Sequence, residues 1–351
     1  MNVSVLVPAH NEASNIQNVL DSLLSQKTVH AKLAEIIVIA SGCTDNTAEL
    51  ARGVARGKPG MHVHVQERRA GKVAAINEYL KIRDPRADVI VICSADLRVH
   101  PDVVERIAEC FRENPKVGMV GARPVPDNDT SQLVGKMVNV LWEMHHRIAL
   151  EHPKMGELVA FRANLIERVS ELSVVDEASI EDVVRSKGFE LAYVGDAIVT
   201  NHGPEKWSEY FEQRRRIARG HYWLDFAFGY AVATLDKGLL VRTALDVAKE
   251  EDAFGKKAIL AAAATEVAAR LAGFFDARIL GGKHRTWTQL SSTKTLREVG
   301  EVIARVSQRP PPMPPASTST STTTSTSTGG GGPTDGRGSS SNVRAVGGSR
   351  R

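Results

Sequence analysis

The stretch that most constrains the fold is a run of five apolar residues, Val89–Cys93, most of them β-branched. A run of this length and composition is typical of a strand that is buried on both faces of a sheet. It ends at Ser94, Ala95 and Asp96, so one carboxylate follows the strand directly. In open α/β sheets, ligands bind at the carboxyl ends of the strands. The sequence therefore predicts a buried central strand with a candidate ligand-binding residue, Asp96, at its end.

Other strand-like runs alternate with helical patterns along the chain. We expect strands near residues 3–8, 35–40, 62–65, 117–121, 156–162 and 190–194. Strands that alternate with helices of ordinary length predict βαβ units and a mainly parallel sheet flanked by helices. The expected fold class is therefore α/β, with a Rossmann-like, mainly parallel mixed sheet and further helices after it.

The composition divides the chain into three parts. Residues 1–225 carry the alternating pattern, residues 226–308 are typical of helices, and residues 309–351 consist mostly of Pro, Ser, Thr and Gly. The last part has too few apolar side chains to offset the loss of chain entropy, so we expect a disordered tail. The net charge of +4 is small for 351 residues and gives no reason to expect a nucleic-acid partner.

Cysteine usage and hydropathy predict the compartment. An odd number of cysteines without CxxC spacing suits a reducing compartment; they are Cys43, Cys93 and Cys110. The first strand begins by Val3, which leaves no room for a signal peptide. The most apolar segment, Ala258–Phe275, is interrupted by Glu266 and Arg270, so we expect no membrane-spanning helix. The protein is expected to be cytoplasmic and at most peripheral to the inner face of a membrane.

The helix expected at Ala258–Phe275 has two interpretations. Its apolar residues recur at helical intervals, so it either packs on the preceding domain or lies on a bilayer near a lipid-linked acceptor. Its alanine-rich composition, with Lys256 and Lys257 only at its start, favours packing. Peripheral membrane contact through the C-terminal helices is the alternative.

Four polar motifs follow four successive predicted strands. They are P-A-H-N-E from Pro8, S-G-C-T-D-N-T from Ser41, R-A-G-K from Arg69 with Asn77 beyond it, and S-A-D from Ser94. Three later motifs are G-E-L-V-A-F-R (156–162), D-E-A-S-I-E (176–181) and Q-R-R-R-I-A-R-G-H (213–221). In this order they resemble the motifs of family-2 glycosyltransferases with the GT-A fold. The resemblance covers about residues 1–225.

This resemblance implies an activity. Enzymes of the family transfer a sugar from a nucleotide-diphospho-sugar to an acceptor hydroxyl with inversion, by direct displacement. The acceptor implied here is a glycan, a lipid-linked molecule or a small molecule. Two rival functions remain: a sugar-nucleotide-binding protein without turnover, and a nucleotidyltransferase on a similar sheet.

The resemblance also implies which residues bind the donor. Glu12 corresponds to the carboxylate that binds the base and ribose. In the second motif, Ala40 and Ser41 stand where the family has paired acids, which leaves the donor base open. Asp45 is either a donor contact or the cap of the next helix. The donor-binding residues inferred by position are Pro8, Ala9, Glu12, Ser41, Asp45, Gly71, Lys72, Asn77, Ala95, Asp96, Gln213, Arg216 and Arg219.

Charged residues of two motifs suit a diphosphate. Gly71 allows close backbone approach, and Lys72 supplies a point charge. Arg216 and Arg219 fall on one helix face by their spacing of three, and guanidinium groups bind phosphate oxygens well. Ile217 replaces the tryptophan of the family's Q-x-x-R-W motif, which favours a single transfer over polymer synthesis.

Asp96 is the expected metal ligand. The family usually has D-x-D here, and Ser94 occupies the first position. Mg²⁺ and Mn²⁺ accept diphosphate oxygens and waters beside a single carboxylate. The implied cofactor is therefore a divalent metal, Mg²⁺ or Mn²⁺.

Two acidic pairs are candidates for the catalytic base. The family's pair lies about a dozen residues before a Gly-aromatic step, and counting back from Gly188 gives Asp176 and Glu177. A carboxylate at a helix N-terminus is kept ionised by exposed N–H groups. Either Asp176 or Glu177 could be the base, and the position within the pair favours Glu177. We expect Glu181 and Asp182, one turn further on, to lie on a solvated helix face.

Overall fold

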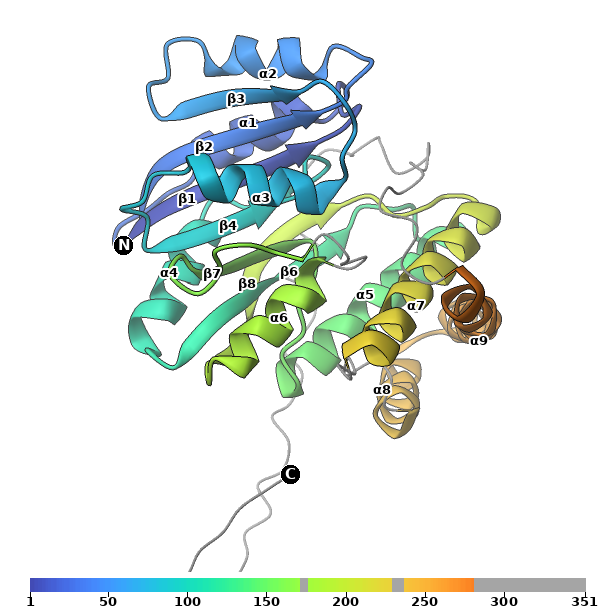
Figure 1. Cartoon of the computed structure of the whole chain (residues 1–351). Helices are drawn as coiled ribbons and strands as arrows, with labels where there is room; N and C mark the ends of the chain where they lie inside the picture. The colour runs from blue at the N-terminus through green and yellow to red at the C-terminus, as the bar shows by residue number, and fades with distance from the viewer. Residues whose placement is uncertain (171–175, 229–236, 281–351) are drawn as a thin grey trace, which may run out of the picture. The chain divides into compact units, whose positions relative to one another are not determined.

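The structure is a computed structural model that describes residues 1–170, 176–228 and 237–280 (Figure 1). Its eight-stranded sheet is built from β1 (Asn2–Ala9), β2 (Lys32–Ser41), β3 (Met61–Gln66), β4 (Val89–Cys93), β5 (Arg98–Val99), β6 (Val117–Pro126), β7 (Leu158–Arg162) and β8 (Glu190–Asn201). The helices of the described part are α1 (Ile16–Leu24), α2 (Thr47–Ala55), α3 (Lys72–Ile82), α4 (Val103–Glu113), α5 (Leu133–Glu151), α6 (Asp176–Ser186), α7 (Trp207–Phe228), α8 (Lys237–Glu250) and α9 (Ala253–Leu280).

The sheet is mixed and mostly parallel, as the alternating pattern predicted. Its strand order is β3-β2-β1-β4-β7-β6-β8-β5. Strands β1 to β4 pair in parallel, and so do β6 and β8. The exception inside the sheet is β7, which lies between β4 and β6 and is antiparallel to both. This insertion brings the residue before β7 to the carboxyl end of β4.

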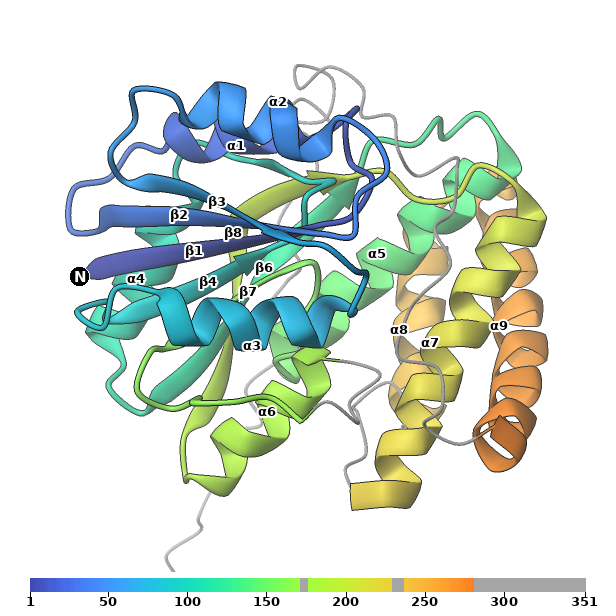
Figure 2. The same cartoon turned by 45° about the horizontal axis from the view of Figure 1, so that its top comes forward.

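Helices cover both faces of the sheet, because each strand of the centre is apolar on both sides (Figure 2). One face packs against α1, α2 and α4, and the other packs against α3 and α6. The apolar residues of α1 recur at helical intervals and are buried against the first face; they are Ile16, Val19, Leu20 and Leu23. The expected α/β fold, a mainly parallel mixed sheet flanked by helices, is thus confirmed.

Helices α5, α7, α8 and α9 pack on one another beside the sheet (Figures 1 and 2). Glu266 of α9 accepts hydrogen bonds from Arg214 of α7 at 2.7 and 3.1 Å and from Arg270 of its own helix at 2.8 Å. A Cβ on Gly273 would lie 2.8 Å from the backbone of Arg215, so α7 and α9 are in close contact there. The expected i, i+4 pair of Glu266 and Arg270 is confirmed and includes a third residue.

Some predictions need correction. Strand β5 was not predicted, because two residues are too few to show the apolar pattern of a strand. Within the described residues one helix, Ala253–Ile279, is long and apolar enough to cross a membrane by length and composition, with 33% of its most apolar window buried. The expectation that no segment reaches this threshold is therefore wrong.

Other predictions remain untested. The tail at 309–351 and a helix expected near residues 295–306 lie outside the described residues. The domain boundaries at residues 225 and 308 stay predictions.

Candidate functional site

Hydrogen bonds join the loops that follow β1 and β2. The backbone N–H of Glu12 donates to Thr47 Oγ1 at 2.7 Å. The side chain of Glu12 is buried, and Asn15 Nδ2 donates to its Oε2 at 3.2 Å. Across the two loops, Asn11 Oδ1 accepts the N–H of Thr44 at 2.8 Å. The carboxylate expected to bind base and ribose is therefore fixed beside the carboxyl ends of two parallel strands.

Asp45 stabilises the start of α2. Its Oδ1 accepts the N–H of Thr47 at 3.0 Å and also the Thr47 hydroxyl. Its Oδ2 accepts the N–H of Ala13 at 3.1 Å. An Asp that accepts the N–H two residues further on forms a local turn that can begin a helix. Of the two roles left open by the sequence, the structure shows this local one, and donor contact stays a prediction.

The loops after β2 and β3 are in direct contact. Ser41 is buried, and its Oγ accepts the N–H of Ala70 at 3.3 Å. Gly42 has φ +56°, and a Cβ there would lie 2.3 Å from the backbone nitrogen of Arg69. A side chain at Gly42 would push the loops apart, so glycine is needed. Gly71, with φ +90°, makes the turn into α3.

The other inferred donor-binding residues of the sheet lie at the same edge. Pro8 and Ala9 end β1, where Ala9 pairs with Ala40 of β2. Ala95 is buried in the turn after β4. Asn77 differs, because its amide donates to Val169 O at 2.9 Å and accepts the Val169 N–H at 2.8 Å. Both ends of the Asn77 amide thus stabilise the chain between β7 and α6.

Lys72 and Glu177 form an ion pair, with Nζ and Oε1 2.5 Å apart. Lys72 is the first residue of α3, and Glu177 lies in the first turn of α6. Their side chains are 30% and 21% exposed, so solvent reaches the pair. The N-terminus of α6 favours an ionised carboxylate. The structure therefore brings into contact the cation predicted to bind phosphate and a carboxylate predicted to act as base.

The acidic pairs of α6 have different surroundings. Asp176 is the first residue of α6, so the pair chosen from the sequence lies in the first turn as expected. Glu181 is buried, and its Oε1 accepts the N–H of Met155 at 3.3 Å. The expectation that Glu181 lies on a solvated face is wrong, because α6 packs this side chain against the segment that precedes β7. Asp182 is partly exposed.

A carboxyl group that sequence reasoning did not single out, Glu157, lies near Asp96. Cys93 pairs with Leu158 across the β4–β7 ladder. The next residues are also in contact, since Ser94 Oγ donates to the Glu157 carbonyl at 3.4 Å. Burial raises the pKa of the Glu157 side chain to about 7, and the negative charge of Asp96 adds to the rise. The charge on Asp96 therefore affects the ionisation of Glu157.

Charges from three helices surround Glu157. Lys72 at the start of α3 lowers its pKa, whereas Glu177 at the start of α6 raises it. Burial lowers the pKa of Arg216 on α7 to about 10, against the opposing effects of Glu212 and Glu157. We call the five residues that act on one another here the charged cluster: Lys72, Asp96, Glu157, Glu177 and Arg216.

The arginines of α7 divide between two partners. Arg214 and Arg215 bind α9, Arg214 through Glu266 and Arg215 through both oxygens of Asp276 at 2.8 and 2.9 Å. The charge of Arg216 instead interacts with that of Glu157 in the charged cluster. Gln213 and Arg219 are half-buried on the same helix, and their predicted contact with the donor stays a prediction.

The donor atoms of the charged cluster suit a divalent cation. Asp96 and Glu157 supply carboxylate oxygens, which Mg²⁺ and Mn²⁺ prefer. Lys72 and Arg216 supply positive charge for phosphate oxygens. The residues at this edge therefore fit a diphosphate accompanied by a metal ion.

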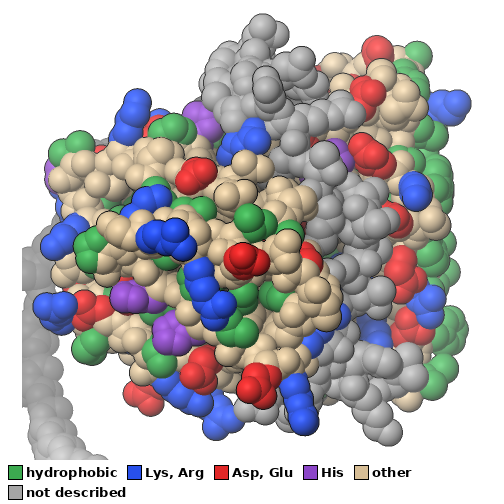
Figure 3. Space-filling view, turned by 90° about the horizontal axis from the view of Figure 1, so that it is seen from above, with side chains coloured by type: hydrophobic (Ala, Val, Ile, Leu, Met, Phe, Trp, Pro, Cys, Tyr) green, Lys and Arg blue, Asp and Glu red, His purple; other side chains and the backbone are tan. Residues whose placement is uncertain are grey.

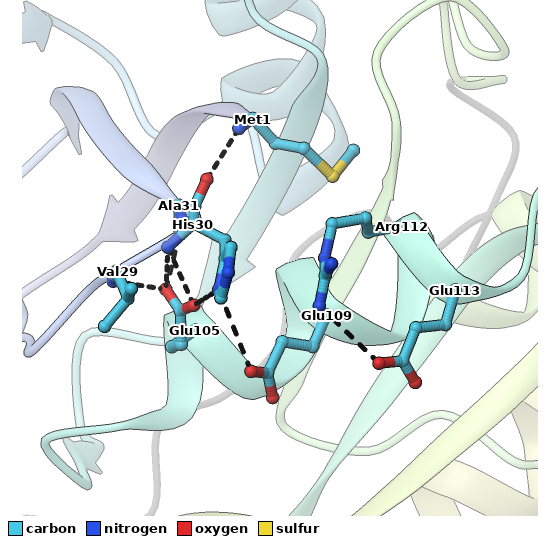
Figure 4. Close-up of polar contacts among 8 residues, drawn as sticks. All are labelled: Met1, Val29, His30, Ala31, Glu105, Glu109, Arg112 and Glu113. Atoms are coloured by element: carbon cyan, nitrogen blue, oxygen red, sulfur yellow. Dashed lines mark hydrogen bonds and ion pairs between the residues drawn. The ribbon is translucent and has the colours of Figure 1, made fainter.

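Another group of potential metal ligands has a structural role. Within the described ranges, His30, Glu105 and Glu109 have ligand atoms within 4.8 Å of one another (Figure 4). The Glu105 carboxylate accepts the backbone N–H groups of Val29, His30 and Ala31 at 2.8–3.1 Å. Burial acts to raise the pKa of Glu105, but these hydrogen bonds outweigh it and lower the pKa to about 2. Glu105 thus attaches the segment before β2 to α4.

Comparison with known proteins agrees with this geometry. Residues 4–162 match the sequence model of the family described as Glycosyl transferase family 2. The chain contains a glycosyltransferase family 2 domain. The domain includes the loops after β1 to β4 and the strand β7 that follows Glu157.

Relatives of this glycosyltransferase domain include two staphylococcal synthases. The poly-beta-1,6-N-acetyl-D-glucosamine synthase of Staphylococcus aureus is 28% identical over 233 residues, which cover 62% of this chain and 54% of that protein. The protein of the same name from Staphylococcus epidermidis is 30% identical over 138 residues, which cover 39% of this chain and 32% of that protein. The chain thus spans about half the length of the S. aureus relative.

A solved structure shows the same fold. The mannosyltransferase PcManGT from Pyrobaculum calidifontis, in complex with GDP-Man and Mn²⁺, has a TM-score of 0.56 at 19% identity, covering 79% of this chain and 87% of that chain. The family-2 domain of this chain therefore has the GT-A fold that the sequence motifs implied.

Proposed function

We propose that the chain is an inverting glycosyltransferase that uses a nucleotide-diphospho-sugar and a divalent cation, Mg²⁺ or Mn²⁺. The observation that carries this proposal is the charged cluster, in which two cations and three carboxyl groups meet at the carboxyl ends of the strands. A binding protein for an uncharged ligand would have no use for such a cluster, because buried charges are costly without a charged partner.

The residues divide the reaction between them. In this proposal Lys72 and Arg216 neutralise the diphosphate, and Asp96 holds the cation, which when bound would stabilise the charge of the leaving diphosphate. Glu177 or Asp176 accepts the proton of the acceptor hydroxyl. The acceptor oxygen then bonds to the anomeric carbon while the bond from that carbon to the diphosphate oxygen breaks. The products are an inverted glycoside and a nucleoside diphosphate.

The names of the similar proteins order the donors to be tested. The staphylococcal synthases are named for a polymer of N-acetylglucosamine, and PcManGT was solved with GDP-Man. Nucleotide-activated N-acetylglucosamine and GDP-mannose are therefore the first donors to examine. Because Ile217 replaces a tryptophan, we propose a single transfer rather than polymer synthesis.

The test is a donor screen with the full chain. Release of nucleoside diphosphate is measured for UDP-, GDP- and dTDP-sugars with Mg²⁺ or Mn²⁺, with and without EDTA. At least one donor should be consumed in a metal-dependent way, and Asp96→Ala should abolish that turnover while melting temperature stays close to wild type. Tight donor binding without any release, across all donors and simple alcohol acceptors, would favour a binding protein instead.

We also propose that the enzyme is cytoplasmic and works at the inner face of a membrane, where α9 contacts lipid. The residues of α9 between Leu260 and Phe275 that face solvent are all apolar; we call them the outer face of α9, namely Leu260, Ala263, Ala264, Val267, Ala268, Leu271 and Phe275. In Figure 3, a row of hydrophobic side chains lies along the right margin, on the side that α9 occupies in Figure 1. Glu266 and Arg270, the charges of this stretch, bond to each other and Glu266 also bonds to α7.

The charges at the ends of the outer face favour lipid over a second copy of the chain. Lys256 and Lys257 are exposed at one end and Arg278 at the other. Anionic headgroups would meet all three cations, as is typical of interfacial helices. A two-fold pairing of α9 with α9 would instead set cations against cations in either orientation. The nearby carboxylate of Asp252 accepts the N–H of Gly255 at 2.7 Å.

A further inference from the structure

Glu157 occupies a position that the topology of the sheet determines. Strand β7 runs antiparallel to β4, and the pair Cys93–Leu158 is followed by Ser94 and Glu157. Ser94 is the first residue of the S-A-D motif, which ends in Asp96. The motif therefore has one carboxylate of its own, and a second is brought to it from the neighbouring strand.

The carboxyl group of Glu157 lies among polar and charged groups at the carboxyl end of β4. Its side chain is partly buried and hydrogen-bonds to the side chain of Asn201, at the end of β8. The two charged residues with the largest effect on Glu157 are Asp96 and Lys72. Asp96 disfavours a negative charge on Glu157, and Lys72 favours it. Two carboxyl groups at such a site disfavour joint ionisation unless a cation lies between them. A divalent cation bound by both carboxylates would offset their mutual repulsion.

We propose that Glu157, together with Asp96, holds the divalent cation that accompanies the donor diphosphate, so that β7 supplies the carboxylate that Ser94 does not. This inference rests on the proposed function, since it assumes a metal-bound nucleoside diphosphate. In this inference Glu157 binds the metal. Lys72 and Arg216 neutralise the charge of the diphosphate that the metal leaves.

The test measures Mn²⁺ binding directly. Free Mn²⁺ is followed by electron paramagnetic resonance during titration of the full chain, with UDP or GDP present, and circular dichroism confirms that each variant is folded. Glu157→Gln keeps the size of the side chain and a hydrogen-bonding group for Asn201. It should weaken Mn²⁺ binding by at least the roughly 10–100-fold that loss of a group supporting a metal site costs.

Two further variants separate metal binding from other roles. Glu212 also acts on Arg216 but lies outside the charged cluster, so Glu212→Gln is the matched control and should bind Mn²⁺ within about twofold of wild type. A double variant adds Ser94→Asp to Glu157→Ala. It places a carboxylate at the end of β4, across from the position that Glu157 occupied before β7. This double variant should recover at least part of the lost affinity.

The outcomes distinguish this inference from the proposed function. If wild type binds no Mn²⁺ with either nucleotide, the metal-dependent function itself is overturned. If wild type binds Mn²⁺ and Asp96→Asn does not, but Glu157→Gln binds like wild type, only the role of Glu157 is overturned. Equal weakening of nucleotide binding by Glu157→Gln with and without Mn²⁺ would also overturn it, because Glu157 would then act through Arg216.

Discussion

The contact between Lys72 and Glu177 connects two roles at the scale of single residues. Their ion pair joins the first turns of α3 and α6, and both side chains remain within reach of solvent. A donor diphosphate would compete with Glu177 for the Lys72 ammonium group. Arrival of the donor would therefore free the carboxylate at the time when a base is required.

This arrangement predicts the effect of removing the base. Glu177→Gln should reduce transfer by roughly 10²–10⁴-fold, as expected for a positioned general base. The donor should bind no more weakly, because Glu177 contacts no phosphate in the proposed reaction and its loss frees Lys72 for the diphosphate. Turnover with saturating donor and donor affinity by calorimetry should be measured separately.

Asp182→Asn is the matched control, since Asp182 lies on the same helix and is partly exposed. It should reduce turnover far less than Glu177→Gln. Asp176→Asn completes the series, because Asp176 is the alternative base. A nearly silent Glu177→Gln together with a damaging Asp182→Asn would show that the register counted back from Gly188 is wrong.

How far single residues could be predicted depends on what fixes them. Lys72, Asp96 and Arg216 follow recognisable motifs, and the structure places all three in one cluster. Glu157 stood inside a motif but was not singled out, because its importance depends on which residue of β4 it faces. That is decided by the antiparallel insertion of β7, which no local pattern records. The apolar residues before Arg162 predicted that a strand forms there, but not which strand it pairs with.

At the scale of elements, Glu105 shows how a helix can organise a loop. Its carboxylate accepts hydrogen bonds from three consecutive backbone N–H groups (Figure 4). These bonds fix the segment that connects α1 to β2. Removing the carboxylate would leave donors without an acceptor near a buried residue, Ala31. Glu105→Gln should therefore lower the free energy of unfolding by about 1–3 kcal/mol, measured by urea denaturation.

The pH dependence of this effect follows from the direction of the pKa shift. The pKa of Glu105 falls from its ordinary 4.5 to about 2 in the folded protein, so its contribution is fully present above pH 4.5 and is lost as pH falls toward 2. The stability difference between wild type and Glu105→Gln should narrow over this range. Glu109→Ala is the control, because Glu109 is 43% exposed and lies 4.0 Å from the His30 ring; it should change stability by less than about 0.5 kcal/mol. A difference that is constant from pH 7 to pH 3 would contradict the assignment.

Elements with strong periodicity were predictable, and their partners were not. The pattern of α9 gave a helix and the Glu266–Arg270 pair correctly. It did not show that Val267 and Leu271 face solvent, because helical spacing gives a face but not what the face contacts. The structure shows that α7 packs on one side of α9 and leaves the side with Val267 and Leu271 exposed.

At the scale of the whole molecule, the outer face of α9 predicts membrane binding. The full chain should cosediment with anionic vesicles at physiological salt, and less with neutral vesicles. Val267→Asp should weaken this binding by about tenfold or more, since burying one such side chain is worth about 1.5–3 kcal/mol. Val29→Asp, at a site that is 83% exposed near β2, should leave binding unchanged. No binding to anionic vesicles, or concentration-dependent dimers abolished by Val267→Asp, would contradict the assignment to lipid.

Deleting residues 309–351 should leave the melting temperature and in-vitro turnover nearly unchanged. The reason is composition, because Pro, Ser, Thr and Gly offer little apolar surface to bury. Calorimetry and the donor assay on the truncated chain check this. A fall of several degrees in melting temperature would mean that the segment contributes to the folded core.

The contacts between α7 and α9 have a mechanical consequence. Glu266 and Asp276 of α9 each bind a neighbouring arginine of α7, and Gly273 allows the two backbones to approach closely. Rotation or sliding of one helix against the other would break several of these charged contacts at once. We therefore expect α7 and α9 to move together as one rigid unit. The residue after the two anchored arginines is Arg216. A displacement of α9 would therefore also move the helix backbone that carries the Arg216 side chain.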